Sequence, residues 1–287
     1  MDTLPTHEWR SRVQAHAERL TPFARERNER RAQGVKHPVN DFLFEYYSFG
    51  ASQLLRWTPG ANVILEGATP ADVPWKEFVA VPEGMVLRAA DFPEHRVSYL
   101  HWALNYLESV AERPAAFGCF GLHEWAMVYH ETTVRHAKTP LRLPPAEIAA
   151  VVEEDGVRCT HYDAYRFFSP DAVPLNRLTL TRKTTTDHDQ KGCVHVTMDL
   201  YRFAYKIAPW CEAETLADAF MLAWEARQLD MRASPYELSA YGVEPLLIET
   251  RVGREEYVAA QRELARQGEP IRARLIEQYR RVLTGWE

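Results

Sequence analysis

The chain has 287 residues, of which 46% are hydrophobic and 26% are charged, and its formal net charge is −6. This composition predicts an ordered globular protein with a sizeable buried core, and it argues against disorder. An acidic chain lacks the broad basic surface of non-specific nucleic-acid binding, so DNA is only a weakly supported partner. The start MDTLPTHEWR is polar, and no window holds the ~20 apolar residues of a membrane span. We therefore expect a cytoplasmic protein that has no membrane partner.

The pattern of elements predicts a mainly α fold, a multi-helix globular domain with a few short strands. We expect one globular unit over 1–287, with a surface helix in 1–33, a core that carries the candidate site in 37–250 and a charged helix in 251–287. An irregular, partly extended insertion is predicted around 58–92, where prolines and glycines separate short β-like stretches.

Helical periodicity and helix-ending residues place the individual elements in chain order. A polar helix is expected over 8–33, and an aromatic-rich buried helix follows in 37–57. After the insertion, helices are expected over 94–112, 122–137 and 144–155. A strand over 157–168 and a long loop over 174–191 come next. Helices return over 193–208 and 214–231, from Ser234 onward, and over 254–283, where Pro270 predicts a kink.

The segment LHEWAMVYHE is the first that could carry chemistry. A zincin motif would need a second histidine at the position of Met127, so that motif is absent. His123 and His130 are nevertheless two helical turns apart on one face, and Glu124 lies on the neighbouring face. The alternative is a buried structural histidine with exposed carboxylates around it.

The segment CTHYDAYRFF is the second that could carry chemistry. Strand alternation would place His161, Asp163 and Tyr165 on one side, with Tyr162 and Arg166 on the other. A His-x-Asp pair is half of the facial triad of non-haem iron enzymes, which His188 or His195 would complete. That triad occurs on β-rich barrels, and this sequence has too few strands for one.

The helix expected after Cys193 is the third segment that could carry chemistry. His195, Asp199 and Arg202 fall at helical spacing and form one polar stripe between bulky apolar residues. The alternative is an ordinary solvent-facing side of a helix.

Other patterns point to structure or exclude a class. The four cysteines form no CxxC pair, which predicts free thiols and no zinc knuckle. Asp230 and Arg232 are expected to cross-link two helices. No phosphate-binding loop, dinucleotide-binding turn or serine-hydrolase elbow occurs in the sequence.

Five stretches together resemble bacterial proteins known as 3-methyladenine DNA glycosylases, namely HPVNDFLFEYYSF, FGCFGLHEWAMVYH, HYDAYRFFSPDAVPLN, MDLYRFAYK and LDMRASPYEL. The resemblance spans most of the chain, from His37 to about Leu264. It implies hydrolysis of the N-glycosidic bond of a modified purine, with the base held in an aromatic pocket. No helix-hairpin-helix motif occurs here, so no functional residue is carried over from that class.

Two functions follow as expectations. The first is an N-glycosylase-type hydrolase that acts on a modified purine base or nucleoside. The alternative is a metal-dependent enzyme that uses histidines and carboxylates to bind iron or zinc and acts on a small polar substrate. A non-catalytic helical binding protein is a third interpretation, which leaves the internal histidines and aspartates unexplained.

The site residues expected for these functions fall into three groups. The predicted catalytic residues are Asp163, His161, Glu124 and Tyr165. The predicted substrate-binding residues are Trp125, Tyr129, Tyr162, Arg166, Asp199 and Arg202. The predicted metal ligands are His123, His130 and His195. We expect the elements that carry His123, His161 and His195 to line one cavity, together with Asp163 and Asp199.

Overall fold

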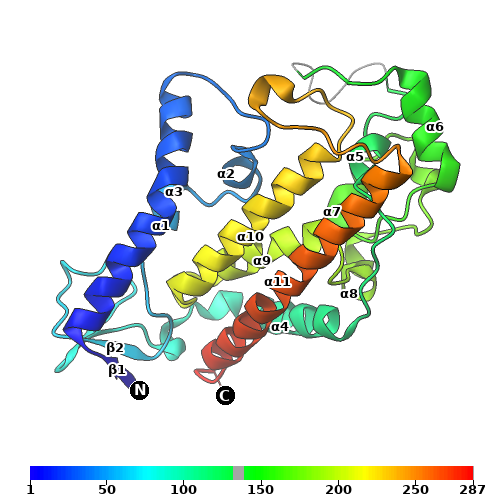
Figure 1. The fold of residues 1–287 in the computed structure, drawn as a ribbon. Helices are drawn as coiled ribbons and strands as arrows, with labels where there is room; N and C mark the ends of the chain where they lie inside the picture. Colours follow the sequence, from blue (N-terminus) through cyan, green and yellow to red (C-terminus); the bar gives the residue numbers. More distant parts are fainter. Residues whose placement is uncertain (132–138, 287) are drawn as a thin grey trace. The chain divides into compact units, whose positions relative to one another are not determined.

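The computed structural model describes residues 1–131 and 139–286, and it confirms the mainly α prediction. In these residues the chain forms eleven α-helices and one four-stranded sheet (Figure 1). None of the described helices is both long enough and apolar enough to cross a membrane.

The chain divides into two compact units. The first contains Met1–Glu108, Asp199–Ala223 and Pro270–Glu287, and the second contains Ser109–Met198 and Trp224–Glu269. Three long helices, α9 (Val194–Lys206), α10 (Ala213–Arg232) and α11 (Arg251–Leu283), supply residues to both units. The expectation that the chain is a single globular unit stays a prediction.

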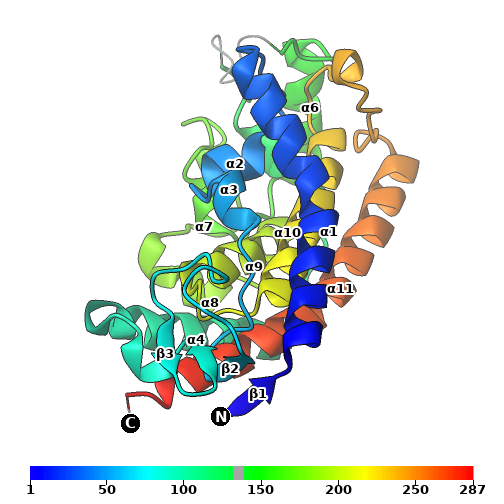
Figure 2. The same cartoon turned by 90° about the vertical axis from the view of Figure 1, so that its left-hand side faces the viewer.

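In the first unit, the chain starts with strand β1 (Asp2–Leu4) and continues directly into helix α1 (Thr6–Ala32). The N-terminal helix is therefore present as predicted, and it buries Trp9, Leu20 and Ala24 on one stripe. Both ribbon views show β1 at the end of α1 where that helix begins (Figures 1 and 2). Leu4 and Trp9 join a hydrophobic cluster with Trp57 and Leu65, which ties the start of α1 to the sheet.

The insertion predicted around 58–92 contains the other three strands, β2 (Val63–Glu66), β3 (Val79–Val81) and β4 (Gly84–Val86). The sheet order is β1-β2-β4-β3, with β1 parallel to β2 and the other pairs antiparallel. Gly84 has φ +152°, and a Cβ there would lie 1.9 Å from the Leu65 carbonyl oxygen. Only glycine allows the two strands to approach this closely.

The aromatic-rich segment after α1 forms two short helices, α2 (Phe42–Tyr46) and α3 (Ala51–Leu54), where one helix was predicted. Ser48 at φ 53° and the extended Gly50 separate them. Helix α4 (Val97–Glu112) then follows close to its predicted position.

In the second unit, short helices and loops surround the segments of α9, α10 and α11 that belong to it. The shorter helices are α5 (Leu122–Ala126), α6 (Pro145–Asp155), α7 (Tyr162–Tyr165) and α8 (Thr185–His188). Each unit also contains short 3-10 helices. Those of the first unit are Ala89–Asp91 and Glu94–Arg96, and those of the second are Val173–Leu175, Arg182–Thr184 and Ser239–Tyr241.

The helix predicted over 122–137 ends at Ala126, so the prediction was wrong for 127–131. The Ser169 amide donates to the Ala126 carbonyl at 3.0 Å, which occupies the acceptor that the residue 130 amide would need. His130 then has φ 56°, outside helical geometry. The remaining part of the prediction, 132–137, lies outside the described residues.

Two further predictions were also wrong. The segment predicted as a strand over 157–168 contains helix α7, because the amides of Tyr165 and Arg166 bond to the carbonyls of His161 and Tyr162. Only Val157 retains a β-type bridge, with Asn176. The helix predicted from Ser234 does not form, since Leu246 bonds to Arg232 and Arg142 to Pro235 in an irregular turn.

Candidate functional site

Three side chains of the second unit come together although they lie far apart in the sequence. His123 is on α5, His195 on α9 and Asp230 on α10. One ligand atom from each lies within 4.8 Å of the others, and the rings of His123 and His195 are 4.4 Å apart between centroids. His123 and Asp230 are buried, and His195 is partly exposed. Two imidazoles and one carboxylate are a ligand set that transition metals bind.

His123 and Asp230 form a close, buried pair. Nε2 of His123 lies 2.7 Å from Oδ1 of Asp230. Both atoms are buried, and the short distance between them is that of a buried ion pair.

Within this pair, each group shifts the pKa of the other. Burial disfavours the charged form of His123, but the Asp230 carboxylate outweighs it and raises the pKa of His123 well above its ordinary value. Burial likewise opposes charge on Asp230, and His123, then His195 and Arg227, lower the pKa of Asp230. The carboxylate is therefore ionised at neutral pH, as a metal ligand must be.

Arg227, on α10, anchors the carboxylate from the other side. Its Nη1 donates to Oδ2 of Asp230 at 2.8 Å and to Oε1 of Glu124 at 3.2 Å. The guanidinium is only 2% exposed, and Glu124 is also buried. This network fixes Asp230 so that Oδ1 faces His123. Asp230 links α10 to α5 through His123, so the expected cross-link between helices is found for Asp230, whereas Arg232 instead donates to the Glu244 carbonyl.

Cys119 lies on the opposite edge of the His123 ring. Its Sγ is 3.7 Å from Nδ1 of His123, in the turn that precedes α5. A hydrogen bond from Cys159 and then the interaction with His123 lower the pKa of Cys119 well below its ordinary value. The hydrogen bond to Cys119 and burial raise the pKa of Cys159, and burial raises that of Cys193. The charge of this thiol set is thus concentrated on Cys119.

His161 and Asp189 extend the cluster beyond His195. The rings of His161 and His195 are stacked with centroids 5.2 Å apart, and Nε2 of His161 lies 3.9 Å from Oδ2 of Asp189. Arg113 holds the Asp189 segment by donating to the carbonyl of Thr186 at 2.9 Å and to the carbonyl of Asp189.

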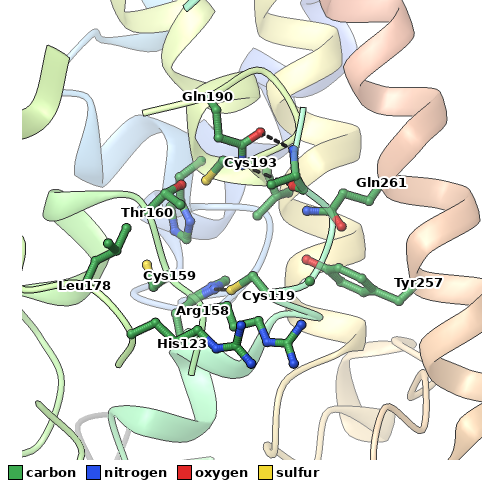
Figure 3. A pocket seen from close by; sticks show the side chains of 15 residues that line it. Cys119, His123, Arg158, Cys159, Thr160, Leu178, Gln190, Cys193, Tyr257 and Gln261 are labelled. Carbon is green, nitrogen blue, oxygen red and sulfur yellow. Dashed lines mark hydrogen bonds between the residues drawn. The ribbon is translucent and has the colours of Figure 1, made fainter. Parts of the chain in front are cut away.

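A cavity of about 350 Å³ opens beside these residues. Its wall comes from the turn before α5, from 158–160, from 177–178, from 190–195 and from α11. Figure 3 shows Tyr257 and Gln261 of α11 reaching toward the same space as Cys119, Cys159 and Gln190. His123 and His195 also line it, so the candidate ligands face a volume that suits a small molecule.

Hydrogen bonds from side chains to the backbone hold the walls together. Gln190 both accepts from the Ala116 amide and donates to its carbonyl, at 2.8 and 3.1 Å. Gln261 donates to the Gly192 carbonyl at 2.7 Å, and Asn176 pairs with both backbone groups of Cys159. These buried and partly buried bonds satisfy backbone groups of loop segments that have no regular secondary structure of their own.

Three of the segments that were predicted to meet do come together, namely those that carry His123, His161 and His195. His123, His161 and His195 lie together, and Glu124 joins them through Arg227. Asp163 instead forms an ion pair with Arg166 at 3.1 Å, and neither side chain is among the described residues that line the cavity. The expectation that Asp163 faces the cavity was therefore wrong, because α7 replaces the predicted strand and changes which side chains share a face.

The other predicted residues of this unit are not among the described residues that line the cavity. His130 pairs with Asp171 at 3.2 Å and is half exposed, since α5 ends before it. Tyr129 donates to Glu153 at 2.6 Å, and Trp125 is fully buried with its Nε1 on the Ala233 carbonyl at 2.8 Å. Tyr165 is buried against Phe168, and Tyr162 lies next to it in α7, partly exposed.

Asp199 and Arg202 belong to the first unit. They pair with each other at 2.6 Å, and Asp199 also accepts from the Tyr47 hydroxyl at 3.1 Å. The stripe expected on the helix after Cys193 is therefore split between the two units, with His195 alone in the candidate site.

Sequence reasoning did not select several residues that form the site: Cys119, Arg158, Asp230, Tyr257 and Gln261. The absence of a CxxC pair correctly indicated free thiols, yet three of the four cysteines line one cavity. The one local signal was the proximity of Cys119 and His123, which are one helical turn apart.

Comparison of the chain with models of protein families, with curated proteins and with solved structures found no match.

Proposed function

We propose that this protein is a metal-dependent enzyme in which His123, His195 and Asp230 hold a zinc or iron ion. The observation that carries the proposal is the convergence of one ligand atom each from His123, His195 and Asp230, which all lie within 4.8 Å of one another. A metal ion bound by His123 and Asp230 would replace the proton that His123 otherwise holds beside the Asp230 carboxylate.

The ligand set and its spacing support a transition metal. Tetrahedral ligand atoms at about 2.1 Å from one ion lie about 3.4 Å apart, and the three candidate atoms all lie within 4.8 Å of one another, so side-chain rotations can bring them to one ion. Hard cations such as Mg²⁺ and Ca²⁺ prefer oxygen ligands, whereas imidazole favours zinc and iron. Arg227 orients the carboxylate, as partners of metal ligands commonly do.

Three protein ligands leave coordination positions for water or substrate, which is the arrangement of catalytic metal sites. The cavity of about 350 Å³ beside His123 and His195 gives a small polar molecule access to those positions. An ion there would lower the pKa of a bound water and polarise a substrate oxygen. The N-glycosylase activity expected from the resemblance stays a prediction.

Metal analysis of the purified protein tests this proposal. We expect a stoichiometric amount of zinc or iron in the wild-type protein and its loss in His195→Ala, because His195 is a ligand whose partial exposure makes its removal tolerable for folding. His101→Ala, which removes an exposed histidine of α4, is the control and should retain the metal. Wild-type protein that takes up no zinc or iron, even when supplied in excess, would contradict the proposal.

A second candidate function is favoured by the position of Cys119. Its thiol faces Nδ1 of His123 at 3.7 Å while Asp230 lies at the other ring nitrogen, which is the order of a Cys-His-Asp nucleophilic triad. Cys119 also lines the cavity. In this alternative the protein is a thiol-dependent transferase or hydrolase that needs no metal.

Alkylation separates the two functions. A triad cysteine should react with iodoacetamide at about pH 6, where an ordinary thiol is almost wholly protonated. In that case Cys119→Ser abolishes labelling, while His195→Ala retains it. Under the metal proposal, Cys119→Ser keeps its metal and His195→Ala does not. Cys211→Ser is the matched control, since Cys211 is buried in the first unit with a raised pKa.

A further inference from the structure

A second set of polar groups lines the cavity and takes no part in the proposed metal ligation. Arg158 and Arg177 both line it, and within the described residues neither guanidinium has an ion-pair partner. Nε of Arg158 is buried and has no hydrogen-bond partner there. A guanidinium stays charged at neutral pH, and a partly buried guanidinium is stabilised when an anion forms an ion pair with it.

Two buried side chains of α11 supply neutral groups on the same cavity. Tyr257 is 0% exposed and Gln261 is 2% exposed. Within the described residues, the Tyr257 hydroxyl and Oε1 of Gln261 have no hydrogen-bond partner. The Gln261 amide nitrogen is held by the Gly192 carbonyl, which orients its oxygen, and Figure 3 shows both side chains directed at the cavity. They offer a bound molecule one donor and one acceptor.

We infer that the cavity binds a small organic oxyanion, a carboxylate or a phosphate ester that also carries hydroxyl or amino groups. Arg158 contacts the anionic group from inside the cavity, and the more exposed Arg177 contacts it from the mouth. Tyr257 and Gln261 bind the neighbouring polar groups. The inference rests on the proposed function only in making this anion the substrate, because the binding itself needs no metal.

The local backbone is suited to this role of Arg158. A Cβ at Gly118 would lie 3.2 Å from Cδ of Arg158, so the absence of a side chain there lets the arginine lie close against the turn that carries Cys119. The anionic group is thereby brought next to His123 and Cys119, the groups in which either candidate chemistry would occur. The unpaired arginines are notable in a chain of net charge −6, which elsewhere offers many carboxylates.

A matched set of three probes tests the inference: glycerate, glycerol 3-phosphate and glycerol. They share hydroxyl groups and differ in the anion. Binding is measured by calorimetric titration and ligand-observed NMR, with the protein as purified and again after treatment with a chelator. We expect one of the two anions to bind under both conditions and glycerol not to bind. The better anion identifies the oxyanion class.

Variants assign the binding to these residues. Arg158→Met should weaken the better anion by at least about tenfold, since it removes charge-assisted hydrogen bonds. Arg158→Lys keeps the charge but loses the planar fork, so it should recover only part of that loss. Tyr257→Phe should weaken binding by a smaller factor. Arg266→Met is the control, because Arg266 pairs with Glu263 on an exposed face of α11. Circular dichroism and thermal melting verify that each variant is folded.

The outcomes separate this inference from the proposed function. Anion binding that survives the chelator and fails in Arg158→Met supports the inference even if the protein contains no metal. Failure of both anions to bind folded wild-type protein overturns it, as does equal binding by wild type and Arg158→Met. Binding of glycerol as tight as that of the anions would also overturn it, because the arginines would then have no role.

Discussion

Asp230→Asn is expected to lower metal affinity by more than about 100-fold. Changes to groups that only orient metal ligands already cost roughly 10–100-fold, and this substitution removes a charged ligand. The asparagine nearly preserves the side-chain shape, so the cavity walls should remain in place. Affinity is measured by competition with a chelator of known affinity, and Asp187→Asn, which removes an exposed carboxylate of α8, is the matched control.

Thermal melting gives an independent reading of the same prediction. A ligand that binds only the folded protein stabilises it by about 2.7 kcal/mol when its concentration is 100 times its dissociation constant. Excess zinc or iron should therefore raise the melting temperature of the wild type and of Asp187→Asn, but not that of Asp230→Asn. A metal-dependent rise that persists in Asp230→Asn would remove Asp230 from the ligand set.

Arg227→Met is expected to lower the free energy of unfolding by about 3–5 kcal/mol, because it leaves the buried carboxylates of Asp230 and Glu124 without their shared cation. Urea denaturation, monitored by tryptophan fluorescence, measures this loss. Adding Glu124→Gln to Arg227→Met should recover part of it, since one of the two uncompensated charges is then removed. A bound metal would supply positive charge to Asp230, so the loss should be smaller in metal-loaded protein.

Arg266→Met provides the surface comparison for this prediction. It breaks an exposed ion pair with Glu263 on one helix, which contributes little to stability. If Arg227→Met were no more harmful than this surface substitution, the guanidinium would not be the counter-charge of the site. The interpretation of Asp230 as an oriented ligand would then lose its structural support.

The helices were predictable where the hydrophobic pattern is long and ends at clear signals. Helices α1, α4, α6, α9, α10 and α11 lie within a few residues of the predicted ranges. The failures are short segments, where tertiary contacts outweigh local preference. Helix α5 ends early because Ser169 takes the Ala126 carbonyl, and the apparent alternation of HYDAYRFF yields to the turn of α7.

The site was predictable in part, because three of the chosen histidines lie together. Residue type was the useful signal: histidines on segments that are otherwise apolar tend to be buried, and buried titratable groups collect where partners can satisfy them. Asp163 and His130 were misplaced because their assignment depended on a strand and on a long helix that do not form. Each error in secondary structure thus moved a side chain to a different face.

The sequence by itself determined the mainly α class, the positions of the long helices and the absence of paired-cysteine and phosphate-loop motifs. Helix formation depends on hydrogen bonds and side-chain spacing within a few turns, so a linear pattern can encode it. Only the tertiary structure decided that His123 meets Asp230, that three isolated cysteines share a cavity and that Arg158, Tyr257 and Gln261 face it. Those contacts join segments far apart along the chain, and they depend on which helix faces pack together, which no local spacing specifies.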